Sequence, residues 1–126
     1  MQITYDPHPD GRADPGEVVW TWVPYEDDPT RGKDRPVVLV GRDGGGRLVG
    51  LMMTSQDHDL DKEQEAREGR FWYDLGSGPW DSKGRRSEVR LNRFIPVDED
   101  DIRRDGAVLD RVRFEALTAA FAPYLP

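Results

Sequence analysis

The sequence predicts a mainly β fold, a small and strongly bent antiparallel sheet or barrel with one α-helix at its C-terminal end. Three observations lead to this fold class. Five or so short apolar segments are separated by turns rich in glycine and proline. The run GRDGGGR, at residues 41–47, supplies turn residues between two of these segments. Residues 110–122 carry the apolar spacing of an amphipathic helix.

The N-terminal end is expected to form an irregular leader, because residues 1–15 contain three prolines and four charged side chains. The remaining residues, 16–126, are expected to form a single domain. No apolar run approaches twenty residues, which argues against a membrane span, and the N-terminus lacks the features of a signal peptide. The chain contains no cysteine, so disulfides and cysteine metal ligands are impossible. A cytoplasmic location is therefore expected.

The first strand is predicted at residues 18–23, where apolar and other side chains alternate. Val18, Trp20 and Trp22 share one face of this strand. Tryptophans spaced in this way are typical of a core or an interface, so we expect both to be buried there or in a dimer.

A hairpin follows a polar loop, with its turn in the run GRDGGGR. The turn joins two apolar strands, at residues 37–40 and 48–53. If the turn is centred between Gly44 and Gly45, antiparallel partners have numbers that add to 89, and Arg35 faces Thr54 at the open end. Pro36 favours an extended backbone at Arg35, which helps to direct the guanidinium.

The C-terminal half is expected to end in a helix that packs on the sheet. Before it come an exposed acidic loop at 57–69, a strand at 70–75, a loop at 76–86, a strand at 87–98 and a short helix at 98–105. Asp110 is a suitable N-cap for the final helix. Its buried stripe is formed by Phe114, Leu117, Thr118 and Phe121.

The charge distribution qualifies the net charge of −7, which by itself argues against a polyanionic partner. Residues 57–69 carry a net charge of −4, whereas residues 70–97 carry +3. The basic segment also contains Trp72, Tyr73 and Trp80. A local basic and aromatic patch is compatible with binding of single-stranded nucleic acid.

The pairing of Arg35 with Thr54 suits the cleavage of RNA by its own ribose 2′-hydroxyl. Charge develops on the non-bridging phosphate oxygens in that reaction, and an arginine fork matches their geometry. A threonine hydroxyl would hold the phosphate or the attacking hydroxyl in line, and no metal or other cofactor is required. The alternative is an exposed arginine and a strand-end threonine without a catalytic role.

Three stretches of the chain resemble the MazF/PemK (growth-inhibitor) toxin family. The first is GEVVWTWVPYEDDPTRGKDRPVVLVGR, with a glycine-acid-valine strand, a polar loop, then arginine-proline before valines and leucines. The second is Thr54-Ser55, which closes the next strand. The third is SEVRLNRFIPVDEDDI, followed by a terminal helix. Together they cover most of residues 16–122.

This resemblance implies a homodimeric SH3-like barrel of the CcdB/PemK type. It implies a metal-independent, sequence-selective endoribonuclease that acts on single-stranded RNA and leaves 2′,3′-cyclic phosphate and 5′-hydroxyl ends. It further implies a cognate antitoxin that blocks the site. Residue by residue, Arg35 and Thr54 match the catalytic arginine and threonine of the family.

Further candidate residues lie beyond these two. His58 is a candidate general acid for the departing 5′-oxygen, because flanking aspartates favour its protonated form; an ordinary solvated loop histidine is the alternative. The candidate RNA-binding residues are Lys33, Ser55, Gln56, Trp80, Lys83, Arg85 and Arg86. Among them, Trp80 would stack on an unpaired base while nearby cations contact phosphates; the alternative is a tryptophan packed over the sheet edge.

Two other functions remain open from the sequence. The same barrel could be a non-catalytic binding module or a CcdB-like topoisomerase inhibitor, a possibility that the retention of Arg35 and Thr54 disfavours. It could also be a decayed toxin that folds but is inert, for which the acidic overall charge is an argument.

Overall fold

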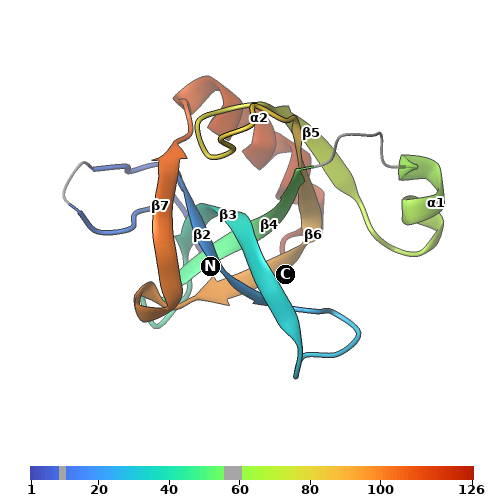
Figure 1. The fold of residues 1–126 in the computed structure, drawn as a ribbon, viewed down its shortest axis with the longest axis horizontal. Coiled ribbons are helices and arrows are strands. Elements are labelled where there is room, and N and C mark those ends of the chain that lie inside the picture. Colours follow the sequence, from blue (N-terminus) through green and yellow to red (C-terminus); the bar gives the residue numbers. More distant parts are fainter. Residues whose placement is uncertain (9–10, 56–60) are drawn as a thin grey trace.

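The computed structural model describes residues 1–8, 11–55 and 61–126 (Figure 1). The strands are β1 (Gln2–Ile3), β2 (Glu17–Pro24), β3 (Gly32–Arg42), β4 (Leu48–Ser55), β5 (Trp72–Gly76), β6 (Ser87–Val97) and β7 (Ile102–Val108). The helices are α1 (Lys62–Arg67) and α2 (Arg111–Phe121), with 3-10 turns η1 (Glu99–Asp101) and η2 (Ala122–Tyr124). Within these described ranges, no helix has the length and apolarity needed to cross a lipid bilayer.

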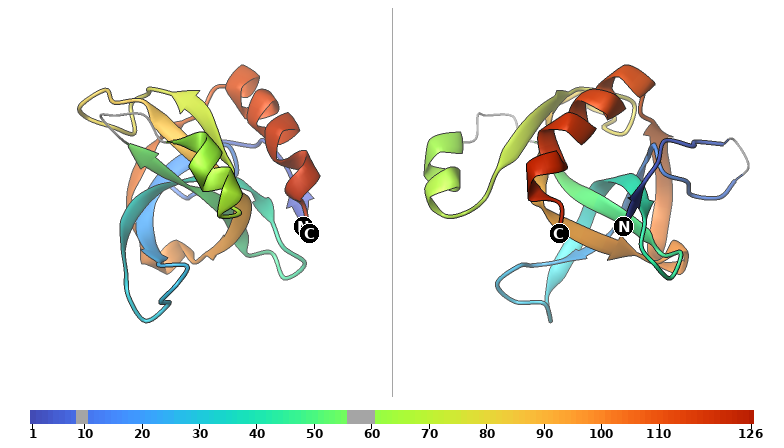
Figure 2. Two further views of the ribbon diagram at one scale, coloured as in Figure 1. Left: turned by 90° about the vertical axis from the view of Figure 1, so that its right-hand side faces the viewer. Right: turned by 180° about the vertical axis from the view of Figure 1, so that it is seen from behind.

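One antiparallel sheet contains all seven strands, in the order β5-β6-β4-β3-β2-β7, with β1 added beside β3. The sheet is strongly curved, and α2 lies against the part formed by β5 and β6 (Figure 2). The predicted mainly β class with a C-terminal helix is therefore confirmed. Closure of the sheet into an SH3-like barrel stays a prediction.

Two buried clusters explain why β3 reads as a continuous apolar run. Val38 and Val40 belong to the cluster that α2 covers, whereas Val37 and Leu39 belong to the cluster on the other face. Successive side chains of a strand point to opposite faces, so a strand with both faces buried shows no polar alternation.

The β3–β4 hairpin has the predicted register at its open end, but for a different reason. The turn is centred on Gly45, since Arg42 pairs with Leu48, half a residue from the predicted centre. A β-bulge at Val40 then shifts the register by one, so that Val37 pairs with Met52 and partner numbers add to 89, as predicted. The turn and the bulge therefore offset one another.

Gly41 is expected to be irreplaceable at the edge where β1 joins β3. A Cβ at this position would lie 2.1 Å from the backbone oxygen of Gln2, so Gly41→Ala should displace β1. We expect faster hydrogen exchange at the Thr4 amide, which donates to Val40 O at 3.1 Å, together with a lower melting temperature. Gly44→Ala is the matched control, because its Cβ would meet nothing within 4 Å. Equal exchange rates in the two variants would contradict this prediction.

Helix α2 has the predicted cap and three of the four predicted buried residues, whereas Thr118 is only partly buried and donates its hydroxyl to the Phe114 carbonyl at 2.9 Å. The Asp110 carboxylate accepts a hydrogen bond from the Arg113 N–H at 3.0 Å, which satisfies a free backbone donor of the first turn. Phe114, Leu117 and Phe121 are buried in the cluster that joins the helix to the sheet.

The N-terminal leader is more ordered than predicted in its described part. Gln2 and Ile3 form β1, which pairs with Arg42 and Gly41 of β3. Tyr5 then packs on Phe114 with ring centroids 5.0 Å apart and donates its hydroxyl to the Leu109 carbonyl at 2.7 Å. The prolines of this segment favoured an irregular structure. The pairing of β3 with β2 ends at Val38, however, so Gly41 and Arg42 are free to pair with β1. The contact of Tyr5 with Phe114 holds the rest of the segment.

The short helix predicted at residues 98–105 is wrong. Only the turn η1 forms there, and β7 begins at Ile102 and pairs with β2. A short helix in isolation is marginal, whereas the edge of β2 offers hydrogen-bonding partners along the whole of β7.

The predicted alternation of β2 holds, but the burial expected for Trp22 at its outer end is wrong for the monomer. Val19, Thr21 and Val23 are buried, whereas Trp22 is 41% exposed. Trp20 is partly buried and donates its indole N–H to the Trp80 carbonyl at 3.1 Å. Burial of Trp22 in the core of the monomer is therefore excluded, and a dimer interface over it stays a prediction.

Candidate functional site

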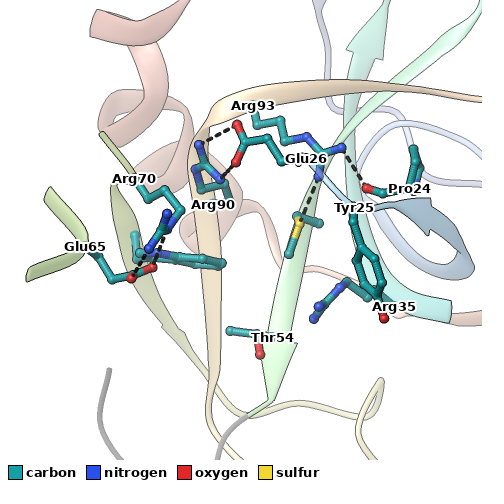
Figure 3. Close-up of a pocket in the computed structure, with 11 residues that line it drawn as sticks. Pro24, Tyr25, Glu26, Arg35, Thr54, Glu65, Arg70, Arg90 and Arg93 are labelled. Carbon is teal, nitrogen blue, oxygen red and sulfur yellow. Dashed lines mark hydrogen bonds and ion pairs between the residues drawn. The ribbon is translucent and has the colours of Figure 1, made fainter. Parts of the chain in front are cut away.

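A polar pocket of about 230 Å³ lies at the open end of the β3–β4 hairpin (Figure 3). Its walls come from the end of β2 and the segment after it, from β3, β4, β5 and β6, and from α1 with the segment that follows it. The lining residues are Pro24, Tyr25, Glu26, Arg35, Met52, Thr54, Glu65, Arg70, Trp72, Arg90 and Arg93. The pocket therefore combines four arginines with only two carboxylates.

Arg35 and Thr54 both line this pocket, as the predicted register requires. The last paired residues of the hairpin are Val37 and Met52. Arg35 lies two residues before Val37, and Thr54 lies two residues after Met52. Figure 3 shows both residues near the ends of their strands. Pro36 is buried, and it restricts the backbone of the preceding residue, Arg35, to an extended conformation. This residue pair lies where the apolar part of β3 begins.

The Arg35 guanidinium is half-buried and has no carboxylate partner among the residues that the structure describes. Burial lowers the pKa of Arg35, and the nearby positive charge of Arg93 lowers it further, whereas Tyr25 acts in the opposite direction. An arginine remains charged despite such a shift because its usual pKa is so high. The pocket thus contains an unneutralised cation with restricted access to water, which is suited to an anionic ligand.

Two further arginines reach the pocket from an irregular part of β6. Leu51 of β4 pairs with Phe94, but Met53 pairs with Val89, so residues 90–93 bulge opposite a single residue of β4. Such bulges redirect side chains and are common beside active sites. Arg90 and Arg93 both belong to this bulge and both line the pocket. Sequence reasoning did not single them out, although the net charge of +3 over residues 70–97 was an available signal.

Arg90 and Arg93 are held in place by different partners. Arg90 is buried and donates two hydrogen bonds to the Glu26 carboxylate, at 2.8 and 3.1 Å, and one to Asn92 Oδ1 at 2.7 Å. The hydrogen bonds from Arg90 lower the pKa of Glu26. Arg93 donates instead to the Pro24 carbonyl at 2.8 Å, so its charge is not neutralised there by a carboxylate (Figure 3).

Helix α1 approaches the pocket through one carboxylate. The acidic loop predicted at 57–69 contains this helix in its described part, with Asp61 as the N-cap. Glu65 accepts hydrogen bonds from Arg70, at 2.6 and 2.9 Å, and from the Trp72 indole N–H at 2.9 Å. Glu68 also pairs with Arg70. These carboxylates neutralise Arg70 and tie α1 to β5.

The contact between α1 and Trp72 is expected to be lost only in strong acid. The hydrogen bonds from Arg70, and then that from Trp72, lower the pKa of Glu65 from 4.5 to about 2. A lowered pKa in the folded state stabilises the contact above pH 4.5, and this stabilisation disappears as the pH falls towards 2. The indole N–H resonance of Trp72 should therefore shift in this range. The Trp80 indole N–H, which donates to the Ser87 hydroxyl at 2.9 Å, is the control and should not shift.

The other predicted RNA-binding residues lie outside this pocket or outside the described residues. Lys33 is exposed on β3, and Lys83 is exposed in the loop between β5 and β6. Ser55 lies at the end of β4, with its hydroxyl 3.4 Å from that of Ser87. Gln56 and the candidate general acid His58 lie among the residues that the structure does not describe.

The predicted cationic loop is tied to neighbouring carboxylates. Arg85 Nε lies 3.0 Å from Asp81 Oδ2, and Arg86 forms an ion pair with Asp74. Asp81 is itself buried, and its pKa is lowered although its burial acts to raise it, because the Lys83 N–H, Ser55 and Arg85 donate hydrogen bonds to it. Arg85 and Arg86 are therefore partly neutralised.

The interpretation of Trp80 as a stacking surface is wrong for this conformation. Trp80 is only 2% exposed and belongs to the cluster beneath α2. Its indole N–H donates to Ser87, and the Arg113 guanidinium lies 5.2 Å from its ring centroid. The alternative, a tryptophan packed against the sheet, is the one that the structure shows, because the loop folds back over the core.

Comparison with known families places the chain among toxins. Residues 14–125 match the family of PemK-like, MazF-like toxins of type II toxin-antitoxin systems. No curated protein matches the chain. The match spans the pocket and nearly the whole of the described fold, from the residues before β2 to the end of η2. The chain therefore belongs to the PemK-like, MazF-like family of type II toxins.

Proposed function

We propose that this protein is a toxin-type endoribonuclease that cleaves single-stranded RNA in a sequence-selective manner and without a metal ion. The products would carry 2′,3′-cyclic phosphate and 5′-hydroxyl ends. The observation that supports this proposal most directly is the pocket in which Arg35, without a carboxylate partner among the described residues, lies near Thr54. Family membership supports a toxin role and a cognate antitoxin as partner.

Arg35 would stabilise the transition state of the cleavage. When the 2′-hydroxyl attacks phosphorus, negative charge grows on the non-bridging oxygens, and a guanidinium can donate two parallel hydrogen bonds to them. Because Arg35 is half-buried, its interaction with these oxygens is less screened by water than that of a surface arginine. The Thr54 hydroxyl would hold the phosphate in line with the attacking oxygen.

The acidic net charge of the chain does not prevent RNA binding at this place. The carboxylates of the pocket are engaged by arginines, Glu26 by Arg90 and Glu65 by Arg70. Arg35 and Arg93 remain to attract phosphate, and Lys33 and Lys83 are exposed for more distant backbone contacts. RNA would therefore approach the open end of the hairpin, and its binding should weaken with added salt.

The proposal is tested by incubating the purified protein with single-stranded RNA in the presence of a chelator and analysing the product ends. Cleavage to cyclic phosphate and 5′-hydroxyl ends, lost in Arg35→Ala, is the expected result. Growth arrest on expression without RNA cleavage would favour the non-catalytic module or the topoisomerase inhibitor instead. If expression causes no growth arrest and the protein cleaves no RNA, the protein is an inert, decayed toxin.

A further inference from the structure

A row of carboxyl and hydroxyl side chains crosses the sheet next to the pocket. Thr54 of β4 pairs with Glu88 of β6, and Glu88 pairs with Asp74 of β5. Directly opposed residues of antiparallel strands project to the same face, so the three side chains form one row. Two residues along the same strands, and therefore on the same face, Trp72 pairs with Arg90, and both of these line the pocket. The row therefore lies on the pocket face of the sheet.

Glu88 is less well neutralised than the other carboxylates near the pocket. Its Oε2 atom is buried and accepts no hydrogen bond from the residues that the structure describes, and Lys62 Nζ of α1 lies 3.5 Å from it. Asp74, in contrast, forms an ion pair with Arg86 and accepts the Gly76 N–H at 3.0 Å. Glu26 and Glu65 receive paired hydrogen bonds from arginines.

These environments move the two neighbouring carboxyl groups in opposite directions. Burial raises the pKa of Glu88, and the negative charge of Asp74 raises it further, against the opposing effects of Lys62 and Arg86. The hydrogen bond from Arg86, and then that from the Gly76 N–H, lower the pKa of Asp74. Raising the pKa of a carboxylate makes it a stronger base and brings its pKa closer to the operating pH, which favours general-base catalysis.

We propose that Glu88 is the general base of the RNA cleavage reaction, next to the hydroxyl of Thr54. This inference rests on the proposed function. The Glu88 carboxylate takes the proton of the ribose 2′-hydroxyl as the O2′–P bond forms and the P–O5′ bond breaks. The departing O5′ takes a proton from solvent water, and Glu88 afterwards returns its proton to solvent. The products are the 2′,3′-cyclic phosphate and the 5′-hydroxyl, and no oxidant or metal is needed.

The test compares single-turnover RNA cleavage by the wild type, Glu88→Gln and Asp74→Asn between pH 4 and 8, with a chelator present. Glu88→Gln should lower the single-turnover rate constant by about 10²–10⁴-fold and abolish the rise of the rate with pH. Its affinity for an RNA with a 2′-deoxy group at the cleavage site should stay unchanged. Asp74→Asn removes a negative charge beside Glu88, which lowers the pKa of Glu88, so the rise should move to lower pH.

Glu115→Gln, an exposed change on α2, is the matched control and should leave the rate unchanged. A wild-type rate in Glu88→Gln, with cleavage still lost in Arg35→Ala, would overturn the role of Glu88 while the ribonuclease function stands. Absence of cleavage by the wild type would overturn both. An NMR titration of the Glu88 carboxyl carbon is an independent measurement, and a pKa at or below the usual value for glutamate would also overturn the proposal. Thermal unfolding of Glu88→Gln verifies that the variant is folded.

Discussion

Replacement of Arg35 by alanine is expected to slow RNA cleavage by about 10²–10³-fold. Arg35 is the pocket arginine at the end of β3, and none of the described carboxylates neutralises it. A half-buried guanidinium in the pocket can donate to the growing charge with less screening by water than a surface arginine. Single-turnover cleavage of a single-stranded RNA in the presence of a chelator measures the effect. The affinity for RNA should fall less, because Arg93 remains in the pocket.

Arg47→Ala is the matched control, since it removes the same charge from the exposed turn at the opposite end of the same hairpin. Its cleavage rate should equal that of the wild type. Arg35→Lys keeps the charge but loses the two-pronged geometry, so an intermediate rate is expected. If Arg35→Ala and Arg47→Ala cleave equally fast, Arg35 has no part in the chemistry.

The largest expected loss of stability follows from Phe121→Ala. Phe121 is fully buried at the end of α2, and its ring packs edge-on against Phe94 of β6 with centroids 5.5 Å apart. Removal of a buried phenyl ring forfeits its transfer free energy and leaves a cavity, at a cost of about 3–5 kcal/mol in the free energy of unfolding. Urea denaturation measures this difference, which is a large part of the total stability of a domain of this size.

Val112→Ala serves as the control on the same helix, because Val112 is 77% exposed. Its free energy of unfolding should change by no more than about 0.5 kcal/mol. A loss in Phe121→Ala as small as that of the control would mean that α2 contributes little to the core.

The elements that the sequence predicts well are those whose signals are local. The cap and buried stripe of α2 lie within a dozen consecutive residues, and the structure confirms them. The glycine-rich turn likewise joins two adjacent apolar strands. The register at Arg35 and Thr54 shows the limit of such reasoning, because the predicted pairing depends on a bulge at Val40 that offsets an error in the turn centre.

The residues that sequence reasoning missed or misplaced depend on contacts between distant segments. Arg90 enters the pocket from a bulge of β6, and its main partner, Glu26, lies in the segment after β2. Trp80 is buried in the cluster that includes residues of α2 and donates a hydrogen bond to Ser87, although its neighbours in the sequence indicate an exposed loop. The environment of Glu88 likewise depends on the strands on either side of it, because Thr54 and Asp74 are its cross-strand partners.

The sequence by itself determined the mainly β class, the C-terminal helix and the hairpin, because spacing of apolar residues and turn chemistry are properties of neighbouring residues. The family was indicated by a resemblance of motifs, among them the arginine-proline run at Arg35 and the Thr54-Ser55 pair. Only the tertiary structure decided which charges share the pocket and which of them remain unneutralised. The physical reason is that the pKa and the free charge of a side chain depend on burial and on partners from other strands. Arg35 and Arg70 are both arginines beside apolar strands, yet only Arg70 is covered by the carboxylates of Glu65 and Glu68.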